Sequence, residues 1–185
     1  MPLASQSTKL NAFPFFLKVA GRRVVIAGGG DEAFAKARLL IQSSAHLTVV
    51  APELDADFAA WIAQHGVEHV AAEPTAAHLH DAVVVFAATG EEEPDRAVVD
   101  LARAAGIPVN AVDRPDLCDF FTPALINRAP VAVAIGTEGA GPVLAQMIRA
   151  KIDALLPPSL GRLATMAASY RHRVEHSVPK GNARR

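Results

Sequence analysis

The order of apolar and polar positions along the chain predicts β-strands that alternate with α-helices. Arg23–Ala27 is a short β-branched run closed by a glycine triplet, and Asp31–Leu40 after it is rich in residues that favour helices. His46–Ala51 is a second apolar run, which is closed by Pro52. A strand, a glycine turn, a helix and a strand within about 30 residues predict a βαβ unit.

The alternation continues through the next part of the chain. Leu54–His65 and Pro94–Ala105 have helical composition, whereas Ala82–Ala88 is a continuous apolar run, typical of a central parallel strand that is covered on both faces. Val67–Val70 and Ile107–Val112 are shorter segments that predict two further strands. The predicted fold class is therefore α/β, with a Rossmann-like doubly wound parallel sheet.

The pattern changes after Asp113, where a polar loop begins. Ala124–Ile126 and Val131–Ile135 predict two short strands joined as a hairpin. A glycine-rich loop follows, and helices are predicted over Pro142–Leu155 and Ser159–His176. These segments predict a second, smaller region after the parallel sheet.

Composition narrows the class of protein. The chain has 185 residues, of which 51% are hydrophobic and 20% charged, and a single cysteine, Cys118, so neither disorder nor a disulfide scaffold is expected. No apolar run approaches the roughly 18 residues of a membrane helix, and no basic region precedes the first apolar residues. A soluble cytoplasmic protein without membrane association is therefore expected.

Charge is unevenly distributed along the chain. Residues 1–150 carry 11 Lys and Arg against 17 Asp and Glu, whereas residues 151–185 carry 7 against 2. We interpret the basic end as a solvated helix face. Because only 5% of the residues are aromatic, no platform for nucleic acid is expected.

Gly28, Gly30 and Ala33 have the spacing of a dinucleotide-binding loop. In such a loop the first glycine permits a tight turn, the second lets the backbone approach a pyrophosphate, and the small third residue lets the helix pack against the strand. The following helix N-terminus offers free N–H groups to phosphates. A plain tight turn is the alternative, but a motif that follows a strand and opens a helix favours a nucleotide site.

The residues after the second strand are expected to select the cofactor. Ala51–Asp55 contains Glu53 and no Arg or Lys, which favours NAD over NADP, because a basic residue would bind the 2′-phosphate. Glu53 is equally well explained as an acid at a helix start. Asp31 and Glu32 have the same two interpretations, as helix-capping acids or as ribose contacts.

Asp113 ends the last predicted parallel strand, where the ligands of open α/β sheets bind. A carboxylate there suits proton transfer, and the structural alternative is an Asp that bonds its own backbone. No resident metal is predicted, because the 7 histidines are scattered without suitably spaced further ligands. Short-chain oxidoreductase chemistry would need Tyr-x-x-x-Lys, but Val174 stands where the lysine would follow Tyr170.

Taken together, these residues resemble the N-terminal module of siroheme synthase, a family that also occurs as a separate precorrin-2 dehydrogenase/sirohydrochlorin ferrochelatase. The matching segments cover almost the whole chain in family order; they are Phe15-Phe16-Leu17, Gly28 to Ala37, Leu47-Thr48-Val49, Ala87-Ala88-Thr89, Asn110 to Asp113, Phe120 to Ala124, and Gly136 to Ala145. The resemblance implies an NAD-binding Rossmann domain over 1–122, a dimerisation region over 123–155, a helical tail over 156–185, and a homodimer.

The resemblance also implies an activity with NAD as cofactor. Precorrin-2 is dehydrogenated to sirohydrochlorin, and Fe2+ is then inserted to give siroheme, with Co2+ as a rival metal substrate. In the family, the aspartate that matches Asp113 serves the proton chemistry of both steps. The predicted cofactor-binding residues are the loop residues Gly28, Gly29 and Gly30, the family's nucleotide contacts Asp31, Glu32, Pro52 and Glu53, and Thr89.

Two alternatives remain open from the sequence. The protein could be a dehydrogenase without chelatase activity, because some relatives perform only the oxidation. It could also be an NAD-binding regulatory module without catalysis, which would leave Asp113 without a role.

Overall fold

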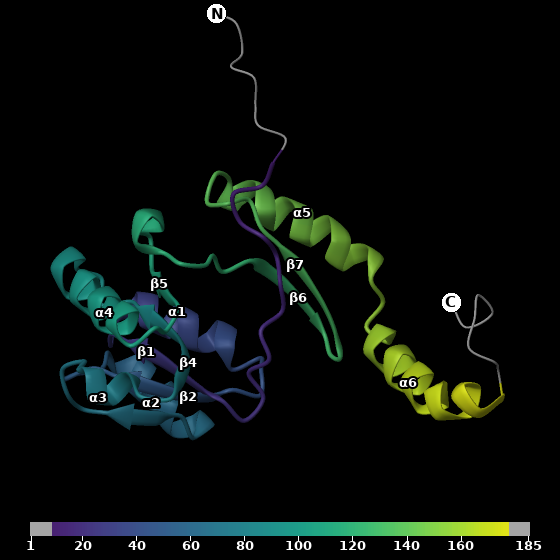
Figure 1. Cartoon of the computed structure of the whole chain (residues 1–185), viewed down its shortest axis with the longest axis horizontal. Helices are drawn as coiled ribbons and strands as arrows, with labels where there is room; N and C mark the ends of the chain where they lie inside the picture. Colours follow the sequence, from purple (N-terminus) through teal and green to yellow (C-terminus); the bar gives the residue numbers. More distant parts are fainter. Residues whose placement is uncertain (1–8, 178–185) are drawn as a thin grey trace, which may run out of the picture. The chain divides into compact units, whose positions relative to one another are not determined.

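The computed structural model describes residues 9–177 of the chain, and their side chains as far as Tyr170. The described chain forms two compact units that divide between Thr122 and Pro123 (Figure 1). The first unit carries the glycine loop and Asp113, and the second contains the hairpin and the last two helices. The end of the predicted helical tail, residues 178–185, lies outside the described residues.

The first unit contains a five-stranded sheet in the order β3-β2-β1-β4-β5, in which all neighbouring strands are parallel. Its strands are β1 (Arg23–Ala27), β2 (His46–Val50), β3 (Glu68–Val70), β4 (Ala82–Ala87) and β5 (Val109–Ala111). From β1 the chain adds strands first on one side and then, from β4 onward, on the other. The carboxyl ends of β1 and β4 therefore form the topological switch point, where open α/β sheets bind ligands. The predicted doubly wound α/β class is confirmed.

Four helices cover the sheet, and they are α1 (Asp31–Leu40), α2 (Ala56–His65), α3 (Ala76–Leu79) and α4 (Glu92–Ala104). Alternate strand residues point to opposite faces. Val24 and Ile26 therefore pack with residues of α1 and α2, whereas Val25 and Ala27 pack with residues of α3 and α4. Because both faces are covered, every residue of β4 is buried, which explains its continuous apolar run.

The sequence pattern predicts neither of two short helices in this unit. The first is α3, a single turn held by a capping box in which Thr75 and His78 bond each other's backbone. The second is the 3₁₀ helix η1 (Pro115–Leu117), within the polar loop after Asp113. Hydrophobic periodicity needs more than one turn to show, so neither helix has a periodic signal.

The second unit contains a two-stranded antiparallel sheet and two helices, in agreement with the predicted hairpin and helical segments. The elements are β6 (Ala124–Arg128), β7 (Val131–Ile135), α5 (Pro142–Leu155) and α6 (Leu160–Ser177). Two polar contacts hold α5 to the hairpin. Arg128 Nη2 pairs with Asp153 Oδ1 at 2.7 Å, and Arg149 Nε donates to the Leu125 carbonyl oxygen at 2.8 Å.

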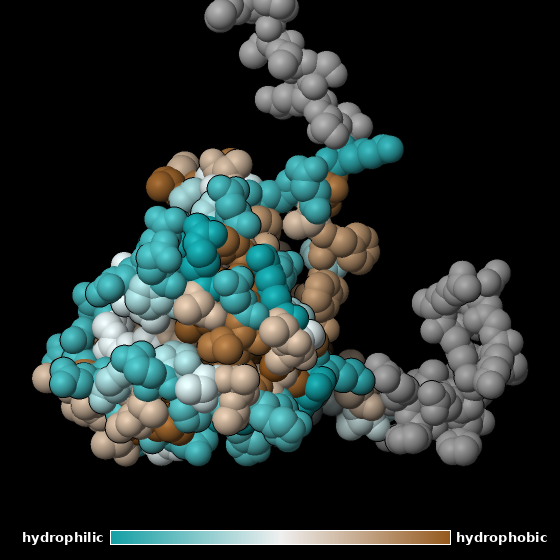
Figure 2. All heavy atoms as spheres, turned by 60° about the vertical axis from the view of Figure 1, so that its left-hand side comes forward, coloured by the Kyte–Doolittle hydropathy of each residue, from teal (hydrophilic) through white to brown (hydrophobic). Residues whose placement is uncertain are grey.

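Large apolar side chains remain exposed on the helices of the second unit. Figure 2 shows hydrophilic residues over much of the visible surface, with apolar side chains between them. The exposed apolar residues of α5 and α6 are Val143, Leu144, Met147, Leu155, Leu163, Met166 and Tyr170. Within the described residues, no helix has the length and the apolar character needed to cross a membrane.

Candidate active site

The loop between β1 and α1 is packed so closely that the fold itself requires two of its glycines. Gly28 has a φ of +135°, and a methyl group there would collide with the carbonyl oxygen of Ala88, after β4. A methyl group on Gly29 would collide with the carbonyl oxygen of Glu53, after β2. The Asp55 amide also donates to the Gly29 carbonyl oxygen at 2.9 Å. The loop is thus held against the loops that follow both neighbouring strands of β1.

Gly30 differs from these two, because the fold does not require a glycine there. Its φ of −97° and ψ of −165° are extended backbone that any residue adopts. Apart from atoms of Gly30 and its neighbours along the chain, the one atom of the described residues that a Cβ at Gly30 would approach within 4 Å is Asp55 Oδ2, at 3.6 Å. Gly30 is also the N-cap of α1 and leaves the first-turn amides without a side-chain cap. A glycine that the fold does not require, beside free amides, is what the close approach of a dinucleotide pyrophosphate needs.

The predicted nucleotide contacts lie at the same edge of the sheet, but in two places. Pro52 and Glu53 are exposed in the loop after β2, and Asp31 is exposed in the first turn of α1. Glu32 is half-buried, and its Oε2 atom is buried without a hydrogen-bond partner among the described residues. Burial raises the pKa of Glu32, and the neighbouring carboxylate of Asp113 raises it further. The structure therefore brings Glu32 to the predicted catalytic aspartate.

Asp113 follows β5 in a tight turn and has a φ of +56°. The Val112 amide donates to the Ala87 carbonyl oxygen at 2.9 Å, and the Arg114 amide donates to the Ala111 carbonyl oxygen at 3.2 Å. These bonds attach the turn to the ends of β4 and β5. The Asp113 side chain is exposed and makes no hydrogen bond within the described part of the chain, so it is not an Asp that bonds its own backbone.

A lysine and a cysteine complete the surroundings of Asp113. Lys36, one helical turn after Glu32, is half-buried; burial lowers its pKa, whereas Asp113 and the other nearby acidic groups act in the opposite direction. The Cys118 thiol donates to the Ala111 carbonyl oxygen at 3.1 Å. Burial raises the pKa of Cys118, which favours the protonated thiol that this bond needs. The cysteine is thus a structural part of the turn.

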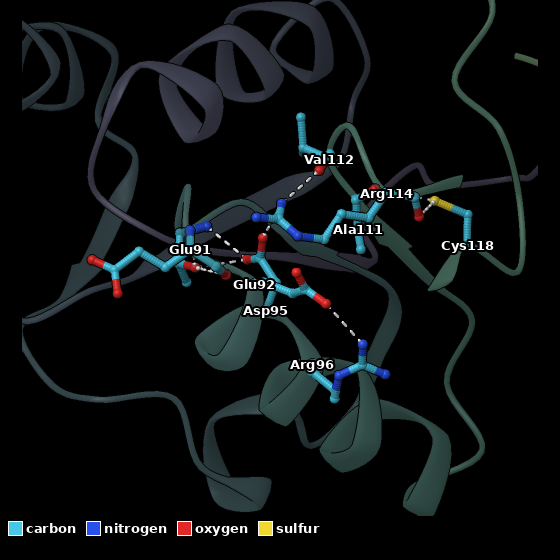
Figure 3. Close-up of polar contacts among 9 residues, drawn as sticks. Glu91, Glu92, Asp95, Arg96, Ala111, Val112, Arg114 and Cys118 are labelled. Atoms are coloured by element: carbon cyan, nitrogen blue, oxygen red, sulfur yellow. Dashed lines mark hydrogen bonds and ion pairs between the residues drawn. The ribbon is translucent and has the colours of Figure 1, made fainter. Parts of the chain in front are cut away.

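A buried carboxylate joins the turn of Asp113 to the loop after β4 (Figure 3). The side chain of Asp95 is 0% exposed, and its Oδ1 accepts bonds from the Thr89 amide at 2.9 Å and the Thr89 hydroxyl at 2.8 Å. Its Oδ2 pairs with Arg114 Nη1 at 2.8 Å. Thr89, a predicted cofactor-binding residue, therefore has its hydroxyl engaged with Asp95.

Neither Asp95 nor Arg114 is among the predicted site residues, although one feature of the sequence points to Asp95. Asp95 shares the buried face of α4 with Val98, Val99 and Ala102. An acid at a core position of an amphipathic helix needs a buried partner. Arg114 has no such signal, because it lies in a polar loop. Among the described residues, no group of three or more His, Cys, Asp or Glu side chains is arranged to hold a metal ion.

The parallel sheet, the glycine loop at its switch point and the amides left open beside Gly30 together define a dinucleotide-binding Rossmann protein. Residues 15–124 match the family model described as "Putative NAD(P)-binding", and the chain belongs to this family. Residues 159–185 match the model described as "Sirohaem synthase dimerisation region".

Similar proteins support these matches and the resemblance to the siroheme synthase module. A siroheme synthase of Nitrosomonas eutropha is 42% identical over 95% of this chain and 37% of its own length. One from Methylobacillus flagellatus is 41% identical over 95% of this chain and 38% of its own length. The chain thus spans well under half of these relatives. The solved structure of "SirC, precorrin-2 dehydrogenase" has a TM-score of 0.77 and 24% identity over 94% of this chain and 85% of that one, which confirms the fold.

Proposed function

We propose that this protein oxidises precorrin-2 to sirohydrochlorin with NAD+ as hydride acceptor, as a step of siroheme biosynthesis in the cytoplasm. The observation that carries the proposal is that the fold tolerates a side chain at Gly30 and so does not itself require a glycine there, at the sheet edge where Asp113 is exposed. The names of the relatives support it, since they include siroheme synthases and, for a protein of the same fold, a precorrin-2 dehydrogenase.

The residues at this edge fit NAD+. The backbone at Gly30 and the first-turn amides of α1 would bind the pyrophosphate, and the exposed Glu53 would bind the ribose hydroxyls. Residues 51–55 include no Arg or Lys for the 2′-phosphate of NADP+. When bound, NAD+ supplies the hydride acceptor, and the protein supplies position and electrostatics.

Asp113 is the proposed general base. Oxidation of precorrin-2 removes a hydride and a proton, and an exposed carboxylate at the carboxyl edge of the sheet is suited to accept the proton. The positive charge of Lys36 partly balances the acids Glu32 and Asp113. Asp113 therefore combines access to solvent and substrate with a backbone fixed by the sheet.

We extend the proposal to the insertion of Fe2+ into sirohydrochlorin, with Fe2+ as a substrate. Metal insertion releases protons from the macrocycle nitrogens, so the same carboxylate serves as the acceptor. Co2+ is the rival metal substrate. A dehydrogenase without the chelatase step would show the first reaction and not the second.

A homodimer is the proposed functional form. Residues 159–185 match a dimerisation region, and α5 and α6 expose apolar side chains such as Val143 and Leu155, at 73% and 79%. A second copy of the chain would cover them, and burial of apolar surface is the main force in such association.

The proposed function is tested by adding precorrin-2 to the protein with NAD+ or NADP+ and following the absorbance change to sirohydrochlorin. Turnover with NAD+ and weaker binding of NADP+ are expected, and Fe2+ or Co2+ is then added to test insertion. Equal or tighter binding of NADP+ would refute the choice of cofactor. Binding of NAD+ without turnover would instead indicate a regulatory module.

A further inference from the structure

Two residues at the edge of the site, Asp95 and Arg114, have no role in the reaction described above. The Asp95 side chain is 0% exposed and that of Arg114 is 22% exposed, with 2.8 Å between Oδ2 and Nη1. A buried ion pair contributes little net stability, because the desolvation of both charges opposes their attraction. The position of this pair, next to Asp113, suggests a different purpose.

Arg114 holds the backbone on both sides of Asp113. Its Nη1 donates to the Val112 carbonyl oxygen at 3.1 Å, and its own amide donates to the Ala111 carbonyl oxygen at 3.2 Å. Asp113 lies between these anchors with a φ of +56°. For a residue other than glycine this conformation is unfavourable, and it persists only where the surroundings determine it. The guanidinium group is one part of those surroundings, because it contacts the backbone next to Asp113 (Figure 3).

Asp95 connects this anchor to the nucleotide loop. Its Oδ1 accepts bonds from the amide and the hydroxyl of Thr89, and Thr89 directly follows Ala88. The carbonyl oxygen of Ala88 in turn leaves no room for a side chain at Gly28. A continuous series of short contacts therefore runs from the turn of Asp113 to the glycine loop.

Building on the function proposed above, we propose that Asp95 and Arg114 are positioning residues that fix Asp113 relative to the glycine loop. Neither needs to touch substrate, because both act through the backbone of the turn. The pair also keeps its own charges balanced in a region that already holds the carboxylates of Glu32 and Asp113.

Another ion pair of the same unit offers a matched control. Arg103 Nη2 pairs with Asp119 Oδ1 at 2.9 Å, and the two side chains are 45% and 35% exposed. Arg103 also donates to the Leu117 carbonyl oxygen at 3.2 Å, so it holds the far end of the same loop without contacting the turn of Asp113. Its loss affects the loop and not the backbone of the proposed base.

The test is the double substitution Asp95→Asn with Arg114→Met, which removes both charges and leaves no buried ion unpaired. The introduced asparagine side chain retains an oxygen for the bonds from Thr89, so the fold is expected to survive. We expect kcat for precorrin-2 oxidation to fall roughly 10–100-fold, with KM and the Kd of NAD+ within about twofold of the parent. Arg114→Lys keeps a cation opposite Asp95 and is expected to restore most of kcat. Arg103→Met is expected to leave kcat unchanged.

A second measurement does not depend on activity. Hydrogen exchange followed by NMR reports the backbone amide of residue 114, which donates to the Ala111 carbonyl oxygen in the parent. Its protection, corrected for the intrinsic exchange rate of the residue at that position, is expected to fall in the double variant and to stay at the parental level in Arg103→Met. If the parent protein does not oxidise precorrin-2, the proposed function is refuted, while the exchange rates still show whether the pair holds the turn. The positioning role is overturned if kcat falls no further than in Arg103→Met, if KM or the Kd of NAD+ rises with the loss of kcat, or if exchange is unchanged.

Discussion

Substitution of Gly30 by serine is expected to separate nucleotide binding from folding. Serine can adopt the extended backbone conformation of Gly30. Outside its neighbours along the chain, the nearest protein atom to a Cβ there is Asp55 Oδ2 at 3.6 Å. Replacing a glycine at a compatible position stabilises a fold by about 0.4–1 kcal/mol, because the unfolded chain loses freedom. A serine at the N-cap adds a few tenths of a kcal/mol relative to glycine, since its oxygen accepts a bond from a first-turn amide.

The same serine should weaken the binding of NAD+. Its hydroxyl would occupy the space and the amides that the pyrophosphate is proposed to use. We expect the Kd of NAD+ to rise at least about tenfold, which corresponds to about 1.4 kcal/mol. Stability and affinity would thus change in opposite directions, which a general loosening of the protein cannot produce.

Gly28→Ala is the matched control in the same loop. The φ of +135° at Gly28 and the collision with the Ala88 carbonyl oxygen both oppose a methyl group there. Backbone strain costs about 1–3 kcal/mol and overpacking about 1–3 kcal/mol, so a loss of roughly 2–6 kcal/mol is expected. This is a large part of the roughly 5–15 kcal/mol by which a domain is typically stable, so the variant is expected to unfold at much lower temperature or urea concentration.

Urea unfolding and calorimetric titration with NAD+ measure the two quantities. If Gly30→Ser binds NAD+ as tightly as the parent, the pyrophosphate does not lie at α1. If Gly30→Ser loses as much stability as Gly28→Ala, then Gly30 is a structural glycine and the observation that carries the proposed function fails.

Three further predictions concern the base, the acid cluster and the assembly. Asp113→Asn is expected to lower the oxidation rate by about 10²–10⁴-fold with NAD+ binding unchanged, whereas Asp116→Asn should keep near-normal turnover. The reverse result would show that Asp113 is not the base. Because the pKa of Glu32 is raised in the folded state, its ionisation lowers stability as pH rises through that pKa. Glu32→Gln should therefore raise the unfolding temperature at neutral pH, but leave it unchanged at a pH well below 4.5, the ordinary pKa of a glutamate, where Glu32 is protonated. An equal change of the unfolding temperature at both pH values would contradict this. Light scattering at micromolar concentration should give a dimer mass, and Leu155→Glu should shift it toward the monomer; a monomer mass for the parent would exclude the proposed dimer.

The sheet could be predicted from sequence because each strand carries its own signal. The burial of β4 on both faces demands an unbroken apolar run, and the glycine triplet after β1 marks the turn into α1. The turn α3 could not be predicted in this way, because Thr75 and His78 stabilise it through their side chains rather than through a periodic apolar face. Local polar contacts of this kind are visible only once the chain is folded.

The sequence predicts the glycine loop and Asp113 of the candidate site, but not the side-chain contacts that connect them. Gly28 and Asp113 are found from the ends of the strands that precede them. Asp95 resembles the other acids at the start of α4, such as Glu92, which is exposed and pairs with Arg96. Asp95 differs from them in lying on the buried face of α4 and in pairing with Arg114, a residue of another loop whose Nη1 lies 2.8 Å from Oδ2 of Asp95. The sequence pattern indicates the first difference and not the second.

The charges around Asp113 also limit what this edge of the sheet can bind. Three acids, Glu32, Asp95 and Asp113, share the region with two cations, Lys36 and Arg114. Arg114 is already paired with Asp95, and the charge of Lys36 is balanced by its acidic neighbours. Neither cation is therefore available to neutralise a polycarboxylate such as precorrin-2.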